Sequence, residues 1–158
     1  MEVKSALLRQ YRASLKMLRQ CIEVCPDELW NKTNDRPYWN IAGHALFYTH
    51  LYLSQSEEDF VSFEPDLEPS HNVWDPVQEG VYFSKEQLLG YCDQLLDGCQ
   101  GLVEKLKLEA DETGFHWYKD MDKFEHQLVN LKHLQGHVGQ LSELLMAVGI
   151  DIDWVSKA

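Results

Sequence analysis

The sequence predicts an all-α fold, a four-helix bundle, and three observations support this prediction. Apolar residues recur at steps of three and four along three stretches, the spacing of helices that face a common core, and a further stretch is apolar on almost every side. Capping residues, prolines and a glycine mark the ends of these stretches. The length of 158 residues falls within the usual span of one domain, so we expect a single domain over residues 1–158.

The first two stretches predict helices on either side of a short connection. Pro37 suits the first turn of the second helix, which should run from Tyr38 to Leu53. This second helix is apolar on almost every side, which predicts deep burial. Pro26 should end the first helix, whose apolar stripe consists of Leu8, Tyr11, Leu15, Leu18, Ile22 and Cys25.

The third and fourth predicted helices both open with a capping pattern. Ser84 with Gln87 forms a capping box, and Asp122 with Glu125 has the same spacing. Gly149 should close the fourth helix. The apolar residues of the third helix are Leu88, Cys92, Leu95, Cys99, Leu102 and Leu106, and those of the fourth include Phe124, Leu128, Leu131, Leu141, Leu144 and Val148.

The connection between the second and third helices, residues 56–83, is too long for a simple hairpin loop. We expect a crossover that passes along the bundle. Its acidic half should be solvated. Its aromatic residues could anchor it; they are Phe60, Phe63, Trp74, Tyr82 and Phe83.

Composition bounds the classes of function. The formal net charge of -12 and the pI of about 4.9 argue against nucleic acid and anionic membranes as partners. No apolar run approaches the roughly 20 residues that span a bilayer, and the N-terminal residues do not look like a secretory signal, so we expect a cytoplasmic protein. The four cysteines share stripes with Leu and Ile and are interpreted as buried apolar residues.

A pair of histidines on the fourth helix is the first candidate for chemistry. His133 and His137 are one turn apart, so both rings can reach one ion. Leu134 stands where a zinc protease of the HExxH type carries its general base, which excludes that class. The pair belongs to a polar strip that a buried hydrogen-bond network would also explain. The strip consists of His126, Asn130, His133, His137 and Gln140.

The second helix offers the third ligand. His44 and His50 are about 120° apart on the helix, so both cannot serve one site, and periodicity does not choose between them. Gly43, Gly136 and Gly139 predict a close approach of the second and fourth helices beside this site, although incidental use of glycine is an alternative.

Two segments then resemble the DinB-like family of four-helix bundles. The second-helix segment 39–46 reads WNIAGHAL, and the fourth-helix segment 131–141 reads LKHLQGHVGQL. The resemblance implies an up-down-down-up bundle and a metal site formed by His44, His133 and His137. It also implies a homodimer as one oligomeric state. Family members with known activity are similar to S-transferases or isomerases that use a low-molecular-weight thiol, and others are described as metal-dependent hydrolases.

These observations leave three functions open. A divalent ion held by three histidines keeps an open position, which favours a thiol S-transferase or a hydrolase that acts on a small-molecule substrate. A non-catalytic module braced by the ion is the third hypothesis. Zinc is the first expectation for the ion, with nickel, iron or manganese as alternatives. Tyr48 and Gln140 are the candidate catalytic residues, for proton handling and for orienting a substrate or a ligand.

Overall fold

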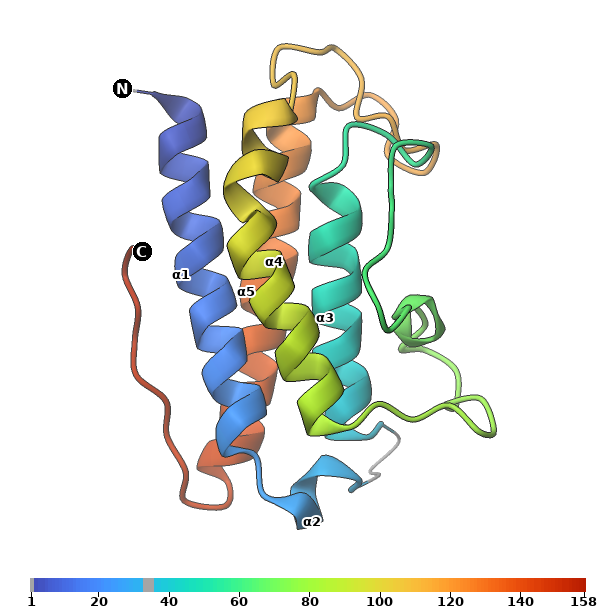
Figure 1. Cartoon of the computed structure of the whole chain (residues 1–158), viewed down its shortest axis with the longest axis vertical. Coiled ribbons are helices and arrows are strands. Elements are labelled where there is room, and N and C mark those ends of the chain that lie inside the picture. Colours follow the sequence, from blue (N-terminus) through green and yellow to red (C-terminus); the bar gives the residue numbers. More distant parts are fainter. Residues whose placement is uncertain (1, 33–35) are drawn as a thin grey trace.

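The computed structural model describes residues 2–32 and 36–158, and its regular structure in these ranges is entirely helical. Four long helices lie side by side in a bundle (Figure 1). They are α1 (Val3–Val24), α3 (Tyr38–Tyr52), α4 (Lys85–Lys105) and α5 (Lys123–Met146). Two short helices, α2 (Asp27–Trp30) and the 3-10 turn η1 (Glu68–Ser70), lie in the connections. The all-α prediction is confirmed.

The helix ends follow the local signals in the sequence. Ser84 and Gln87 form the predicted capping box of α4, with both reciprocal bonds present. Asp122 Oδ1 accepts the amide proton of Glu125 at 2.7 Å and caps α5. Near Gly149, which has φ of +80°, the chain leaves α5. The four cysteines are buried and free, as expected.

The α3 helix is the most deeply buried element, as its apolar composition predicts. Every residue of α3 except Tyr48 is buried. It packs on α5 and on α4, and the connection from residue 53 to 84 passes along its outer side (Figure 1). This long crossover brings η1 against α3. Side chains at the ends of α3 and on its outer side therefore face loops as well as helices.

The aromatic residues of the crossover anchor it only in part. Phe83 is buried, and Phe63 stacks on His50 with ring centroids 4.1 Å apart. Trp74 is 86% exposed, so the expectation that it anchors the crossover was wrong. Tyr82 is 52% exposed but packs edge-on against Trp39 of α3, with ring centroids 5.8 Å apart. The acidic half is not wholly free in solvent either, because a Glu57 carboxylate oxygen lies 2.9 Å from His116 Nδ1.

The apolar stripe that the sequence predicted for the fourth helix is confirmed only in part, because Leu131, Leu141 and Leu144 pack in the core but its other three residues do not. Phe124, Leu128 and Val148 are 38%, 48% and 50% exposed. Polar residues take the inward positions of the first half, where Gln127 Nε2 donates to Tyr52 O at 2.9 Å. The buried residues of α5 are Lys123, His126, Gln127, Asn130, Leu134, Val138, Leu141 and Leu145. The helix thus has a polar inner face near its start and an apolar one near its end.

The predicted glycine contact between the second and fourth helices is wrong. Gly136 and Gly139 are exposed, and a Cβ atom added to either would meet nothing within 4 Å. Gly43 does lie at a close approach, but its neighbour is Ser70 of η1, whose Oγ would be 2.7 Å from an added Cβ. Gly43 therefore accommodates the crossover and not α5.

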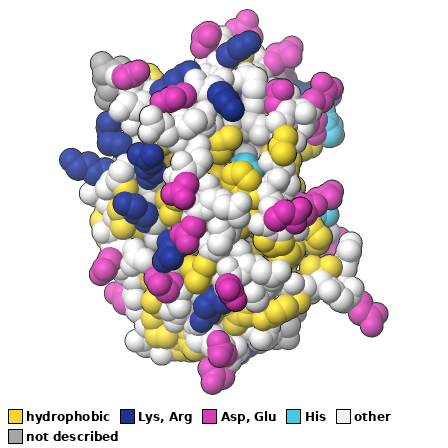
Figure 2. Space-filling view, in the orientation of Figure 1, with side chains coloured by type: hydrophobic (Ala, Val, Ile, Leu, Met, Phe, Trp, Pro, Cys, Tyr) yellow, Lys and Arg dark blue, Asp and Glu magenta, His cyan; other side chains and the backbone are white. Residues whose placement is uncertain are grey.

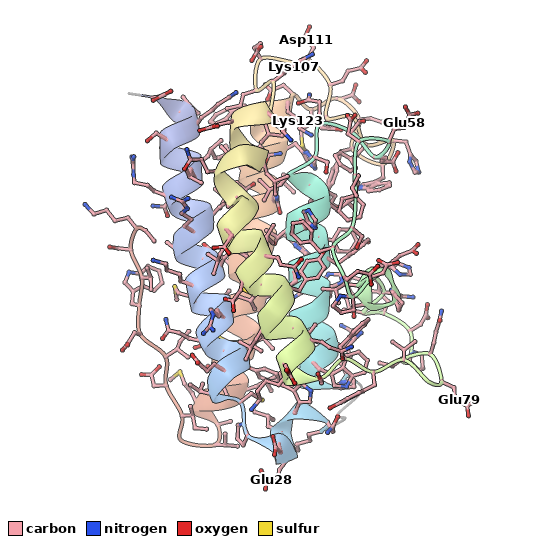
Figure 3. The ribbon with its side chains drawn as sticks, in the orientation of Figure 1. Glu28, Glu58, Glu79, Lys107, Asp111 and Lys123 are labelled. Atoms are coloured by element: carbon pink, nitrogen blue, oxygen red, sulfur yellow. The ribbon has the colours of Figure 1, made fainter. Side chains whose placement is uncertain are left out.

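A buried lysine ties the loops at one end of the bundle together. Lys123 lies at the start of α5, where the loop from α4 arrives (Figure 3). Its Nζ donates to Ser54 O, Gln55 O and Thr113 O at 2.7, 2.9 and 2.8 Å. Burial lowers the pKa of Lys123 to about 8, which leaves it mostly protonated at pH 7. This contact joins the end of α3 to the loop that carries residues 113–118.

The surface is predominantly acidic. Figure 2 shows Asp and Glu side chains over the whole visible face, with Lys and Arg mainly over the α1 side. None of the helices in the described ranges is both long and apolar enough to cross a membrane.

Candidate metal centre

The α3 and α5 helices bring three histidines together at the middle of their contact. His44 lies halfway along α3, and His133 and His137 lie on successive turns of α5. The His133 Nε2 atom is 3.1 Å from Nε2 of His44 and 3.1 Å from Nε2 of His137. One ligand nitrogen from each residue lies within 4.8 Å of the other two. We call these residues the histidine triad.

Hydrogen bonds at the outer nitrogens set the orientation of two triad rings. His44 Nδ1 lies 2.8 Å from the carbonyl oxygen of His71, and His137 Nδ1 lies 3.0 Å from Gln140 Oε1. Both partners are acceptors, so each Nδ1 carries the proton and each Nε2 presents a lone pair to the centre. His133 carries at most one proton on Nε2, and this proton cannot form a hydrogen bond with the Nε2 lone pairs of both His44 and His137. A cation at the centre would satisfy all of them.

The triad is held in the neutral form that metal binding requires. Burial lowers the pKa of His44 to about 3, and a positive charge on His137 or His133 would lower it too. Burial lowers the pKa of His133 to about 4. Burial also lowers the pKa of His137, against the bond to Gln140 that raises it. At pH 7 all three imidazoles are therefore free of the proton that would compete with an ion.

The donor set fits a divalent ion with imidazole preference. Zinc binds histidine nitrogen at roughly 2.0–2.1 Å, which corresponds to about 3.3 Å between ligands in a tetrahedral site. The triad separations of 3.1 Å are close to that value. Three neutral protein ligands are typical of catalytic zinc sites, which keep a position open, whereas structural sites usually have four.

A cavity of about 830 Å³ opens beside the triad. Besides the three histidines, its wall includes Tyr48 and Tyr52 of α3 and Trp117 of the α4–α5 loop. Arg36 and Asp75 also line it. The cavity thus combines an aromatic wall, one guanidinium and one carboxylate around the triad, which suits a small organic ligand.

The comparison with known protein families adds a finding independent of this geometry. The family model described as DinB superfamily matches residues 10–141, a span that includes the whole histidine triad. The chain belongs to the DinB superfamily. Searches of the curated proteins and of the solved structures gave no significant match.

The structure decides between His44 and His50. The structure brings His44, and not His50, to the α5 pair. His50 is buried on another side of α3, where its Nδ1 is 2.7 Å from the Tyr91 hydroxyl. His126, the first residue of the polar strip, is buried against Tyr52 and Phe115 away from the triad.

The two candidate catalytic residues both line the cavity beside the histidine triad. The ring centroid of Tyr48 is 4.8 Å from that of His44, and burial raises the pKa of Tyr48, so its hydroxyl is a neutral donor at pH 7. Gln140 contacts the triad by accepting the Nδ1 proton of His137. This contact restrains the His137 ring, and the roles expected for Tyr48 and Gln140 stay predictions.

Sequence reasoning missed several residues of the cavity. Arg36, Asp75, Trp117 and Tyr118 come from connections between helices, where no periodicity relates a residue to a face. The backbone carbonyl of His71, which orients His44, has no side-chain signature at all. The clustering of aromatic residues at 115–118 was the one available signal for the loop wall.

Proposed function

We propose that this member of the DinB superfamily binds one divalent ion, zinc in the first place, through His44, His133 and His137 and acts as a thiol S-transferase. One observation carries the metal part of this proposal. The Nε2 lone pairs of His44 and His137 both point toward Nε2 of His133. A bound ion would lower the pKa of a coordinated low-molecular-weight thiol and favour its thiolate. The protein's own residues then bind and orient the small-molecule substrate.

The residues around the triad support a transferase. Tyr48 offers a neutral hydroxyl that can donate a proton to a leaving group. Tyr52 and Trp117 provide an apolar wall for an electrophilic substrate, and the Trp117 Nε1 proton goes to the Tyr52 hydroxyl at 3.3 Å. None of these groups is a general base at neutral pH, whereas a thiolate nucleophile does not need one.

Metal-dependent hydrolysis is the second candidate, and Asp75 is the observation that favours it. Asp75 is the one carboxylate in the described wall of the cavity, and a hydrolase could use it as a general base. Its Oδ2 atom accepts a hydrogen bond from Asn72 Nδ2 at 2.6 Å, and this bond restrains the Asp75 carboxylate on the crossover. A non-catalytic, metal-braced module is the third candidate, and finding a further protein ligand would favour it.

The proposal also includes an up-down-down-up helix order and a homodimeric state, which the family resemblance implies. It further includes a single domain and a cytoplasmic location, which the sequence predicts. Nucleic acid and membranes are not partners in this proposal, in keeping with the net charge of -12.

The metal part is tested by analysis of protein purified without an affinity tag or chelating resin. We expect one ion per chain. His44→Ala, His133→Ala and His137→Ala should each bind the ion much more weakly. His116→Ala, which changes an exposed histidine paired with Glu57, is the matched control and should keep it. Stoichiometric metal in the double variant His133→Ala with His137→Ala would refute the site.

The transferase part is tested with cobalt-loaded protein and cysteine, glutathione or 2-mercaptoethanol. We expect a thiolate-to-metal charge-transfer band in the near ultraviolet, which is absent from His137→Ala and retained in His116→Ala. Because the ion favours the thiolate, the band should persist below the free pKa of the thiol. Protein that holds one ion and shows no band with any of these thiols would favour the hydrolase or the structural module.

A further inference from the structure

The Nδ1 atoms of the three triad histidines, which lie on the outer side of the triad, differ in their hydrogen bonds. His44 Nδ1 and His137 Nδ1 each donate to an acceptor, the His71 carbonyl and Gln140 Oε1. His133 Nδ1 is buried and has no hydrogen-bond partner among the described residues. A metal-bound histidine almost always donates its other N–H to a neighbouring acceptor, because this bond fixes the ring and its tautomer. The third ligand therefore lacks an identified outer partner.

Buried polar atoms without partners are concentrated beside His133. Within the described ranges such side-chain atoms occur in four residues, and three of these, His126, Asn130 and His133, lie on one stripe of α5. His126 contributes both ring nitrogens and Asn130 its Oδ1 atom. Since i, i+3 and i, i+4 residues are neighbours on a helix surface, Asn130 lies between His133 and His126, in a row that leads away from the triad.

Asn130 is held so that its oxygen is the free acceptor. The side-chain amide is fully buried, and its Nδ2 donates to Thr49 O of α3 at 3.2 Å. The hydroxyl of the adjacent Tyr11 donates a hydrogen bond to Gln127 Oε1 at 2.8 Å and therefore does not donate one to Asn130 Oδ1. With an ion on its Nε2 atom, His133 would carry its proton on Nδ1, and this donor without an acceptor would stand one helical turn from an acceptor without a donor, on Asn130.

We propose that Asn130 is the outer positioning residue of His133. One bridging water accepts a hydrogen bond from the Nδ1–H group of His133 and donates one to Asn130 Oδ1. A buried water usually has two to four polar partners, which this arrangement supplies. The proposal rests on the metal part of the proposed function, because the bond matters by holding His133 with its Nε2 lone pair toward the ion.

Zinc affinity and metal-free stability separate this role from a merely structural one. Asn130→Leu removes the acceptor but keeps a side chain of similar size. We expect its zinc affinity, measured by competition with a chromophoric chelator, to fall by roughly 10–100-fold. Leu145→Ala is the matched control, since Leu145 is equally buried on α5 but lies two turns beyond His137. It should lower the melting temperature of the metal-free protein and leave zinc affinity within about twofold.

Two further measurements test the proposal even if Asn130→Leu fails to fold. Asn130→Asp keeps an acceptor and should recover most of the lost zinc affinity, even if loss of the donor to Thr49 lowers metal-free stability. In unaltered zinc-loaded protein, nitrogen-proton correlation spectra should show His133 as the Nδ1–H tautomer, with that proton protected from exchange.

The outcomes distinguish the two proposals. If the unaltered protein binds none of zinc, nickel, iron and manganese, the proposed metal function is refuted and the role of Asn130 with it. If it binds zinc and Asn130→Leu binds equally tightly, only the role of Asn130 is refuted. The same holds if Asn130→Asp binds as weakly as Asn130→Leu, or if His133 in the zinc-loaded protein carries its proton on Nε2.

Discussion

Two histidines of one helix show how environment decides what a side chain does. His44 and His50 both lie on α3 and both are buried. Nδ1 of His44 meets a backbone carbonyl, which leaves its Nε2 for the triad, whereas Nδ1 of His50 meets the Tyr91 hydroxyl and its ring stacks on Phe63. His44 is a candidate ligand, and His50 is a core histidine whose neutral form is favoured.

The burial of His50 predicts a pH dependence of stability. Burial lowers the pKa of His50 to about 4, against about 6.5 in an unfolded chain. Between pH 6.5 and 4 the unfolded state therefore binds a proton that the folded state excludes, and stability falls as the pH falls. In metal-free protein, His50→Gln should reduce the slope of unfolding free energy against pH in this window by up to about 1.4 kcal/mol per pH unit. Urea titrations at several pH values measure it, and equal slopes would contradict it.

The contrast between Gly43 and Gly136 gives a second prediction at this scale. Gly43→Ala would place a Cβ atom 2.7 Å from Ser70 Oγ, so we expect a loss of about 1–3 kcal/mol from overpacking. Gly136→Ala meets open space and should stabilise the helix by about 0.5–1 kcal/mol. Urea denaturation of both variants checks this pair. If Gly43→Ala were at least as stable as the parent, η1 would have to move away from α3 at little cost in free energy.

At the scale of elements, α5 combines two functions along its length. Its last turns bury apolar residues such as Leu141 and Leu145, while its first turns bury Lys123, Gln127 and Asn130. These polar side chains bond to carbonyl oxygens of α3 and of the loops. The polar half holds the end of α3 and the 113–118 loop in place, and the triad lies where the two halves meet.

Removal of the buried ammonium tests this anchoring. Lys123→Met keeps most of the apolar stem but leaves the carbonyls of Ser54, Gln55 and Thr113 without their donor. We expect a loss of roughly 2–4 kcal/mol in the free energy of unfolding, because bonds to a charged donor are lost and buried acceptors remain unsatisfied. Lys132→Met, at an exposed position of the same helix, should change it by less than about 0.5 kcal/mol. Equal effects in chemical denaturation would contradict the anchoring.

At the scale of the whole molecule, the cavity differs in charge from the protein that surrounds it. The chain carries a formal charge of -12, yet the described cavity wall holds Arg36 and one carboxylate around a triad suited to a cation. Arg36 lies 5.4 Å from the ring centroid of Trp74 at the cavity edge. With the ion bound, this region would attract an anionic ligand despite the acidic surface.

This charge distribution predicts selectivity between thiols. Zinc-loaded protein should bind 3-mercaptopropionate more tightly than 2-mercaptoethanol, and Arg36→Gln should lose about tenfold of that preference, the equivalent of about 1.4 kcal/mol. Arg12→Gln, on α1 and outside this cavity, is the matched control. Calorimetric titration measures both affinities. The same preference in Arg36→Gln and in the parent would rule out a role for Arg36.

The amino-acid sequence by itself determined the four long helices, their caps and the His133–His137 pair. Each of these depends on residues within a few positions of one another, so local spacing encodes them. Tertiary structure decided which way α3 faces, because a helix that is apolar on almost every side has no polar face to mark its orientation. It also decided the inward polar face of α5 and the addition of Arg36, Asp75 and Trp117 to the cavity. These features arise from contacts between segments far apart in the chain, which no local periodicity records.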